Sequence, residues 1–136
     1  MRLDTQGRRR GATVVAGVAA YAWGLFLTRG GLGITPDSGN YIAGAESLRT
    51  VLQYRGMDGQ PSIHWPPGYP VVLAAAGLAG LDAVTAARLV NCLALAFVAG
   101  LVFRWVRWAT GLTALAAAAF VTCLASAPLV LTARNV

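Results

Sequence analysis

The chain has 136 residues, of which 57% are hydrophobic and 12% charged, and its formal net charge of +6 comes from arginine because it contains no lysine. With a mean hydropathy of +0.60, this composition excludes an ordinary soluble domain and predicts an integral membrane protein. The arginines lie beside apolar runs and form no continuous patch with interleaved aromatics. This pattern argues against nucleic acid as a partner and favours a role in setting topology.

The N-terminal segment has the pattern of an uncleaved transmembrane helix. Three arginines at 8–10 precede an apolar run from Gly11 to Thr28, about 18 residues and near the lower limit for crossing a bilayer. A signal peptide is the alternative, but no small-x-small cleavage site follows the run. We therefore predict a cytoplasmic tail at 1–11 and a transmembrane helix at 12–28.

The mixed segment 29–85 is predicted to be an extracytoplasmic loop that contains a first juxtamembrane helix. Thr35 and Pro36 are a typical helix start, with an N-cap followed by proline at the first helical position. Apolar residues then recur at helical spacing, which predicts one helix through Gln53 or Tyr54 on the membrane interface. The residues of this stripe are Tyr41, Ala45, Leu48 and Leu52.

A second short helix is predicted after the turn-rich stretch YRGMDGQPS. The apolar part of HWPPGYPVVLAAAGLAGLD runs for about 15 residues, or about 22 Å of helix against a hydrocarbon core of about 30 Å. It is too short for a full span. We predict a juxtamembrane or partly inserted helix at 67–81.

Two further apolar runs, 86–103 and 109–131, are long enough to cross a bilayer. If the arginines of the connector RWVRW are cytoplasmic, the positive-inside rule is met at this connector and at the N-terminus. The predicted fold is an all-α membrane protein, one domain over 1–136, with about three transmembrane helices plus an extracytoplasmic loop with two juxtamembrane helices. Because the chain ends directly after an apolar run, we expect it to be the N-terminal part of a larger polytopic protein.

The order of these segments resembles a known family. A basic N-terminus and one span are followed by PDSGNYIAGAESL, then by HWPPGYP and GLDAVTAARLVN before the next span. This order resembles the N-terminal part of GT-C glycosyltransferases, specifically the prokaryotic relatives of the dolichyl-phosphate-mannose protein mannosyltransferases and of the aminoarabinose transferases. The resemblance extends from about Gly11 to Val136.

The resemblance implies an enzyme of the cytoplasmic membrane of a prokaryote, with its N-terminus in the cytoplasm. It would transfer a sugar from a polyprenyl-phosphate donor to a lipid, glycan or protein acceptor on the outer face, and the chain alone is expected to be inactive. In that family an acid of the first outside loop is catalytic, and the matching residue is Asp37. Relatives often have a second acid where this chain has Ser38, so a divalent metal ion is left open as cofactor and no metal ligand is assigned.

Each candidate site residue can be explained by a purely structural role as well as by a functional one. Transfer from a lipid phosphate needs a base for the acceptor and cations for the leaving phosphate. Asp37 shares the apolar stripe of the first juxtamembrane helix and is expected to face protein or membrane instead of bulk water. The alternative to a catalytic role is that Asp37 only stabilises the N-terminus of this helix through the helix dipole. The other residues either bind substrate or only anchor and pack the segment. They are Tyr41, His64, Trp65, Tyr69 and Arg88.

Two other functions compete with the enzyme. A small non-enzymatic membrane subunit could use the outside loop to bind a partner, and would tolerate loss of Asp37. A transporter or channel would place charges inside its spans, and the predicted span interiors contain none. Cys92 and Cys123 lie in apolar runs and, with a single histidine, predict neither a disulfide framework nor a zinc site.

Overall fold

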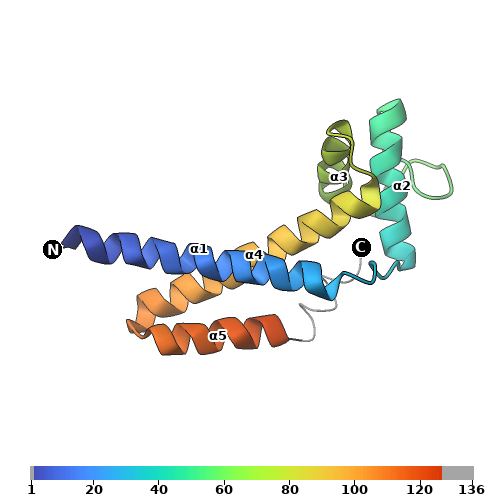
Figure 1. Ribbon diagram of the computed structural model, residues 1–136. Coiled ribbons are helices and arrows are strands. Elements are labelled where there is room, and N and C mark those ends of the chain that lie inside the picture. The colour runs from blue at the N-terminus through green and yellow to red at the C-terminus, as the bar shows by residue number, and fades with distance from the viewer. Residues whose placement is uncertain (1, 127–136) are drawn as a thin grey trace. The chain divides into compact units, whose positions relative to one another are not determined.

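The computed structural model describes the backbone of residues 2–126 and the side chains of residues 11–126. Residues 2–126 form five α-helices and no β-strand (Figure 1). The all-α prediction is therefore confirmed for this part of the chain. The helices are α1 (Arg2–Leu27), α2 (Pro36–Val51), α3 (Gly68–Leu78), α4 (Ala83–Thr110) and α5 (Thr113–Ala125).

The prediction of about three transmembrane helices is not confirmed in full. Among the described helices, only α4 is long and apolar enough to cross a membrane. Gly11–Leu27 within α1, together with α3 and α5, are apolar but shorter. Length and composition do not distinguish a transmembrane helix from a buried helix of a soluble protein, so they assign no membrane by themselves.

The ends of α4 and α5 differ from the predicted runs at 86–103 and 109–131. α4 begins earlier because Asp82 caps it: its Oδ1 accepts hydrogen bonds from the backbone N–H of Val84 at 3.1 Å and of Thr85 at 2.9 Å. Hydrogen bonds to Thr85 lower the pKa of this carboxyl. α5 begins only at Thr113, because Gly111 turns the chain with a φ of 70°. The predicted end at 131 lies outside the described residues.

Tertiary contacts divide the described chain into two compact units, with α4 contributing to both. The three-helix unit consists of residues 2–29 and 92–126. Residues 30–91, which include α2, α3 and the first turns of α4, form the insert unit. Each unit has its own buried cluster.

In the three-helix unit α1 and α4 run antiparallel in close contact (Figure 1). A Cβ placed on Gly24 would lie 3.0 Å from Cys92 Sγ, and one placed on Gly100 would lie 3.9 Å from Gly17 Cα. These small residues let the backbones approach, as is common where apolar helices pair. α5 joins them through the fully buried Ala116, which packs in one cluster with side chains of α1 and α4.

In the insert unit α2 and α3 pack on each other and on the start of α4. The fully buried side chains of this cluster are Ala45, Leu73, Ala86 and Ala87. The predicted start of α2 is confirmed, because Thr35 is the N-cap and its Oγ1 accepts a hydrogen bond from Ser38 N at 3.2 Å. The predicted end at Gln53 or Tyr54 is wrong: Leu52 takes a left-handed conformation with a φ of 55° and ends the helix at Val51.

Candidate functional site

Asp37 lies on the first turn of α2, and its side chain is exposed. This corrects the expectation that it would face protein or membrane instead of bulk water. The stripe that starts at Asp37 becomes buried only further along the helix, at Ala45. Its neighbour Ser38 is fully buried, but the Asp37 side chain points to the exposed side of the first turn, so water reaches the carboxylate.

Three aromatic side chains meet one helical turn away from the acid. Trp65 lies edge-on to Tyr41 with ring centroids 5.9 Å apart, and Tyr69 lies edge-on to Tyr41 at 5.6 Å. We call Tyr41, Trp65 and Tyr69 the aromatic cluster; all three are half-buried. Each such pair contributes about 0.5–1.5 kcal/mol beyond its buried area. Because Tyr41 follows Asp37 by four residues, the cluster and the carboxylate share one face of α2.

Tyr69 also connects α3 to α4. Its hydroxyl donates a hydrogen bond to Asn91 Oδ1 at 2.9 Å. Burial raises the pKa of Tyr69 to about 12, although the hydrogen bond to Asn91 acts in the opposite direction. The hydroxyl is therefore held protonated, as a donor, well above neutral pH.

This shift predicts a dependence of stability on pH. The folded pKa of Tyr69 lies above its ordinary value of 10.0, so the folded chain holds the proton more tightly, and its contribution to stability is complete below pH 10. That contribution falls as the pH rises from about 10 to about 12. Titration of tyrosine absorbance should show one late-ionising group, and this group should be absent from Tyr69→Phe. A titration of Tyr69→Phe identical to that of the unaltered chain would contradict the assignment.

The remaining predicted substrate-binding residues do not join the aromatic cluster. His64 is exposed in the loop before α3, although its neighbour Trp65 is in the cluster. Arg88 is half-buried on α4, three residues and hence about one turn before Asn91. The structure thus brings together three of the five residues and leaves His64 at the surface.

Asn40 positions the loop over α2 and was missed by the sequence analysis. Its Nδ2 donates to Pro36 O at 3.2 Å, and its Oδ1 accepts from Met57 N at 3.2 Å. The loop is closed on itself by a hydrogen bond from Ser62 N to Tyr54 O at 3.0 Å. The signal was present as the asparagine of PDSGNY, but its partner lies 17 residues along the chain and nothing local indicates that contact.

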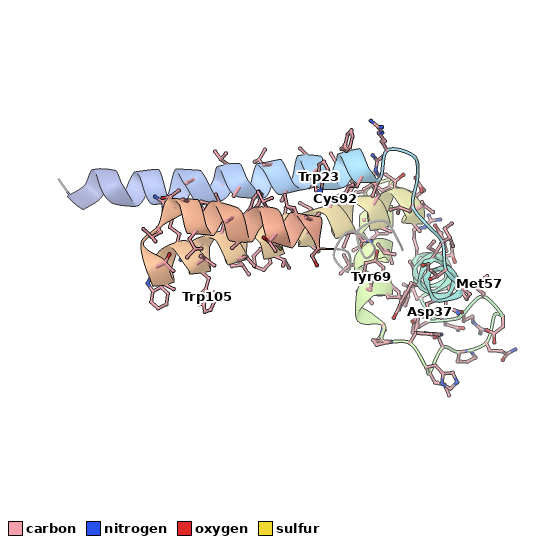
Figure 2. All side chains as sticks on the ribbon, turned by 90° about the horizontal axis from the view of Figure 1, so that it is seen from below. Trp23, Asp37, Met57, Tyr69, Cys92 and Trp105 are labelled. Atoms are coloured by element: carbon pink, nitrogen blue, oxygen red, sulfur yellow. The ribbon has the colours of Figure 1, made fainter. Side chains whose placement is uncertain are left out.

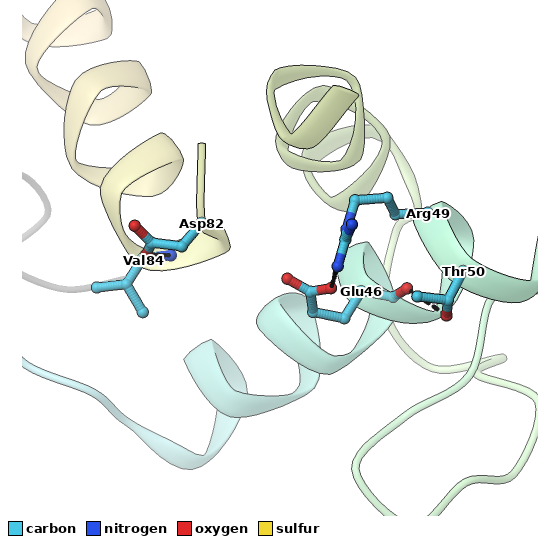
Figure 3. A network of polar contacts seen from close by, with 5 residues as sticks. All are labelled: Glu46, Arg49, Thr50, Asp82 and Val84. Atoms are coloured by element: carbon cyan, nitrogen blue, oxygen red, sulfur yellow. Dashed lines mark hydrogen bonds and ion pairs between the residues drawn. The ribbon is translucent and has the colours of Figure 1, made fainter. Parts of the chain in front are cut away.

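Of the four carboxylates in the insert unit, three are engaged by the chain itself. Glu46 Oε2 lies 2.7 Å from Arg49 Nη2 in an exposed ion pair (Figure 3). Asp58 accepts from Gln60 N at 3.0 Å, and Asp82 caps α4. Among the described residues Asp37 is the acid with no such partner, and Figure 2 shows it on α2 with Tyr69 on the neighbouring α3. It is the carboxylate available to a ligand.

No metal ligand set is assigned. Within residues 11–126 no three His, Cys, Asp or Glu side chains gather closely enough to hold a metal ion. A divalent ion at Asp37 would therefore need other oxygen ligands, from substrate phosphate or from water.

Comparisons of the chain with protein-family models, with curated proteins and with solved structures found no match.

Proposed function

We propose that this chain is the N-terminal part of a membrane glycosyltransferase of a prokaryotic cytoplasmic membrane. The enzyme transfers a sugar from a polyprenyl-phosphate donor to a lipid, glycan or protein acceptor on the outer face. One observation carries the proposal: Asp37 is the unengaged, exposed carboxylate of the insert unit, one turn from the aromatic cluster. The order of PDSGNY and PPGYP in the segment between two apolar helices supports the same assignment.

We place α1, α4 and the apolar run 109–131, of which α5 is the described helix, in the membrane as three spans. α4 has 28 residues, about 42 Å of helix, so both of its ends extend past a hydrocarbon core of about 30 Å. The antiparallel pairing of α1 with α4 brings Thr13 and Arg104 to the same end of the pair. That end carries the arginines at 8–10 and the connector arginines, so the positive-inside rule makes it cytoplasmic. Residues 30–91, which follow the other end of α1 in the chain, are then extracytoplasmic.

In the proposed reaction Asp37 acts as the general base. The acceptor hydroxyl gives its proton to the carboxylate while its oxygen attacks C1 of the donor sugar. The bond between C1 and the phosphate oxygen breaks, its electron pair leaves with the polyprenyl phosphate, and the configuration at C1 inverts. Arg88 stabilises the charge that develops on the phosphate. His64 lies at the exposed edge, where it contacts the same phosphate.

The aromatic cluster binds the donor in this proposal. Tyrosine and tryptophan combine an apolar ring with a polar tip, which suits a ligand that is itself amphiphilic. The half-burial of Tyr41, Trp65 and Tyr69 leaves part of each ring accessible. The fixed hydrogen bond from Tyr69 to Asn91 keeps that ring in place when the ligand leaves.

The proposal is tested by comparing donors in membranes that contain the full-length protein. A radiolabelled sugar on a polyprenyl phosphate should be transferred to endogenous acceptor, and the same sugar on a nucleotide should not be transferred once synthesis of the polyprenyl donor is blocked. Membranes without the protein are the control. Transfer from the nucleotide donor alone would replace the proposed donor class.

A partner-binding membrane subunit is the second candidate. The observation that favours it is the exposure of large apolar side chains around the insert-unit loop: Leu52 is 87% exposed and Ile63 is 83% exposed. Such side chains suit an interface with protein or lipid. This candidate expects no transfer activity and no effect of changing Asp37.

A further inference from the structure

An apolar groove runs between α1 and α4 in the three-helix unit. We call it the α1–α4 groove; its volume is ≈ 560 Å³. Its apolar walls include Val14 of α1 and Leu93, Phe97 and Leu101 of α4, which are between 47% and 68% exposed. Arg104 is the one charged residue that lines it. The groove is thus an open apolar surface with a cation at one end.

The same arginine lines a second, aromatic hollow. This smaller pocket, ≈ 250 Å³, is formed by Leu101, Arg104, Trp105 and Trp108. Both tryptophans are exposed, at 66% and 77%, and Figure 2 shows Trp105 projecting from α4. Tryptophan prefers the boundary between hydrocarbon and water, and arginine binds phosphate with its guanidinium fork. Arg104 therefore lies where the apolar groove meets the aromatic hollow.

The end of the α1–α4 pair that includes Arg104 is positively charged, which favours binding of an anion. Arg107 follows Arg104 by one turn, and its Nη1 is buried without a hydrogen-bond partner among the described residues. α1 continues from the groove toward the arginines at 8–10. No acid lines either hollow. Basic residues concentrated at one end of a helix pair attract the anionic lipids of a cytoplasmic leaflet.

We propose that this end of the three-helix unit binds one anionic phospholipid. One acyl chain lies along the α1–α4 groove, the phosphate is bound by Arg104, and the glycerol region lies beside Trp105 and Trp108. The lipid would hold α1 against α4 at the cytoplasmic end of the pair. This inference goes beyond glycosyl transfer and rests only on the membrane placement of α1 and α4.

The test uses the full chain purified in detergent and measures lipid binding by native mass spectrometry. Phosphatidylglycerol is titrated against phosphatidylcholine with the same acyl chains. We expect one phosphatidylglycerol to be retained selectively, and Arg104→Gln to weaken that binding about tenfold, the loss expected for one charge-assisted hydrogen bond. Ala96→Leu, which fills the groove without changing charge, should weaken it as well. Arg49→Gln removes the same charge from the insert unit and should bind like the unaltered chain.

Several outcomes would overturn the proposal. Equal retention of phosphatidylcholine, or an equal loss in Arg49→Gln, would reduce the binding to general attraction. Competition by glycerol phosphate at the same concentration as the lipid would assign the site to a soluble phosphate. A change of oligomeric mass in Ala96→Leu with unchanged lipid binding would make the groove a docking site for another helix.

The same experiment separates this inference from the proposed enzyme. Asp37→Asn should bind phosphatidylglycerol normally, because the carboxylate belongs to the other unit. Lost lipid selectivity with intact sugar transfer would overturn the lipid site alone. Intact lipid binding without transfer would overturn the enzyme alone.

Discussion

Asp37→Asn is expected to lower sugar transfer by about 10²- to 10⁴-fold, the usual contribution of a general base. The amide keeps the shape of the side chain but cannot accept the proton of the acceptor hydroxyl. Asp37 is exposed and has no partner within the described residues, so the exchange leaves no group unpaired. Its structural cost is limited to the helix-dipole contribution of an acid in the first turn, about 0.3–1 kcal/mol. The measurement is the initial rate of transfer from a polyprenyl-phosphate sugar in membranes with equal amounts of each protein.

Glu46→Gln is the matched control for this exchange. It makes the same chemical change on the same helix, and it removes an exposed ion pair with Arg49 that contributes at most about 1 kcal/mol. Glu46→Gln should transfer sugar at close to the rate of the unaltered enzyme. If Asp37→Asn also keeps that rate, Asp37 is not catalytic and the partner-binding function takes its place.

Gly44→Ala is expected to destabilise the insert unit by about 1–3 kcal/mol, the cost of overpacking. Glycine in the middle of a helix is usually about 0.5–1 kcal/mol less favourable than alanine. Helix propensity alone therefore predicts that Gly44→Ala stabilises the unit. At Gly44 a Cβ would collide with the ring of Tyr54, which covers α2 at this point. The ring would have to move, and the loop it belongs to would move with it. Thermal unfolding of the detergent-purified chain should show a lower midpoint.

Gly77→Ala tests whether the flexibility of the neighbouring side chain decides if a glycine-to-alanine exchange stabilises or destabilises the unit. A Cβ there would lie 2.7 Å from Arg49 Cδ, which is part of a long flexible side chain with an exposed tip. Arg49 can turn away at small cost, so Gly77→Ala should be neutral or slightly stabilising through its helix propensity. Equal loss of stability in both variants would contradict the assignment of the Gly44 effect to the Tyr54 ring.

Local chemistry made part of this fold predictable. The start of α2 depends on Thr35 and Pro36, which act within one turn, and the sequence pattern located it correctly. The short helix after the two prolines was also expected, since its apolar run is bounded by turn residues on both sides. The all-helical class followed from long apolar runs without the alternation of a β-strand.

The features that the sequence did not predict depend on contacts between residues far apart in the chain. The meeting of Tyr41 with Trp65 joins residues 24 positions apart, and no helical or strand period encodes such a pair. The end of α2 was misplaced because its left-handed residue is Leu52 instead of the usual glycine. Likewise the stripe on α2 placed Asp37 against protein, but the packing partners of that face begin a turn or more later. The exposure of the acid is known only from the structure.

The division into two units has a consequence for the order of folding. Within residues 2–126 the insert unit is one continuous segment, 30–91, whereas the three-helix unit joins segments from both sides of it. Gly24 and Cys92, which touch in the folded chain, are therefore about 70 residues apart along it, and closing so long a loop costs conformational entropy. Once α2, α3 and the start of α4 have packed, most of the chain between Gly24 and Cys92 is already ordered. Bringing these two residues together then requires the closure of only a short flexible loop. We therefore expect the insert unit to pack before α1 pairs with α4.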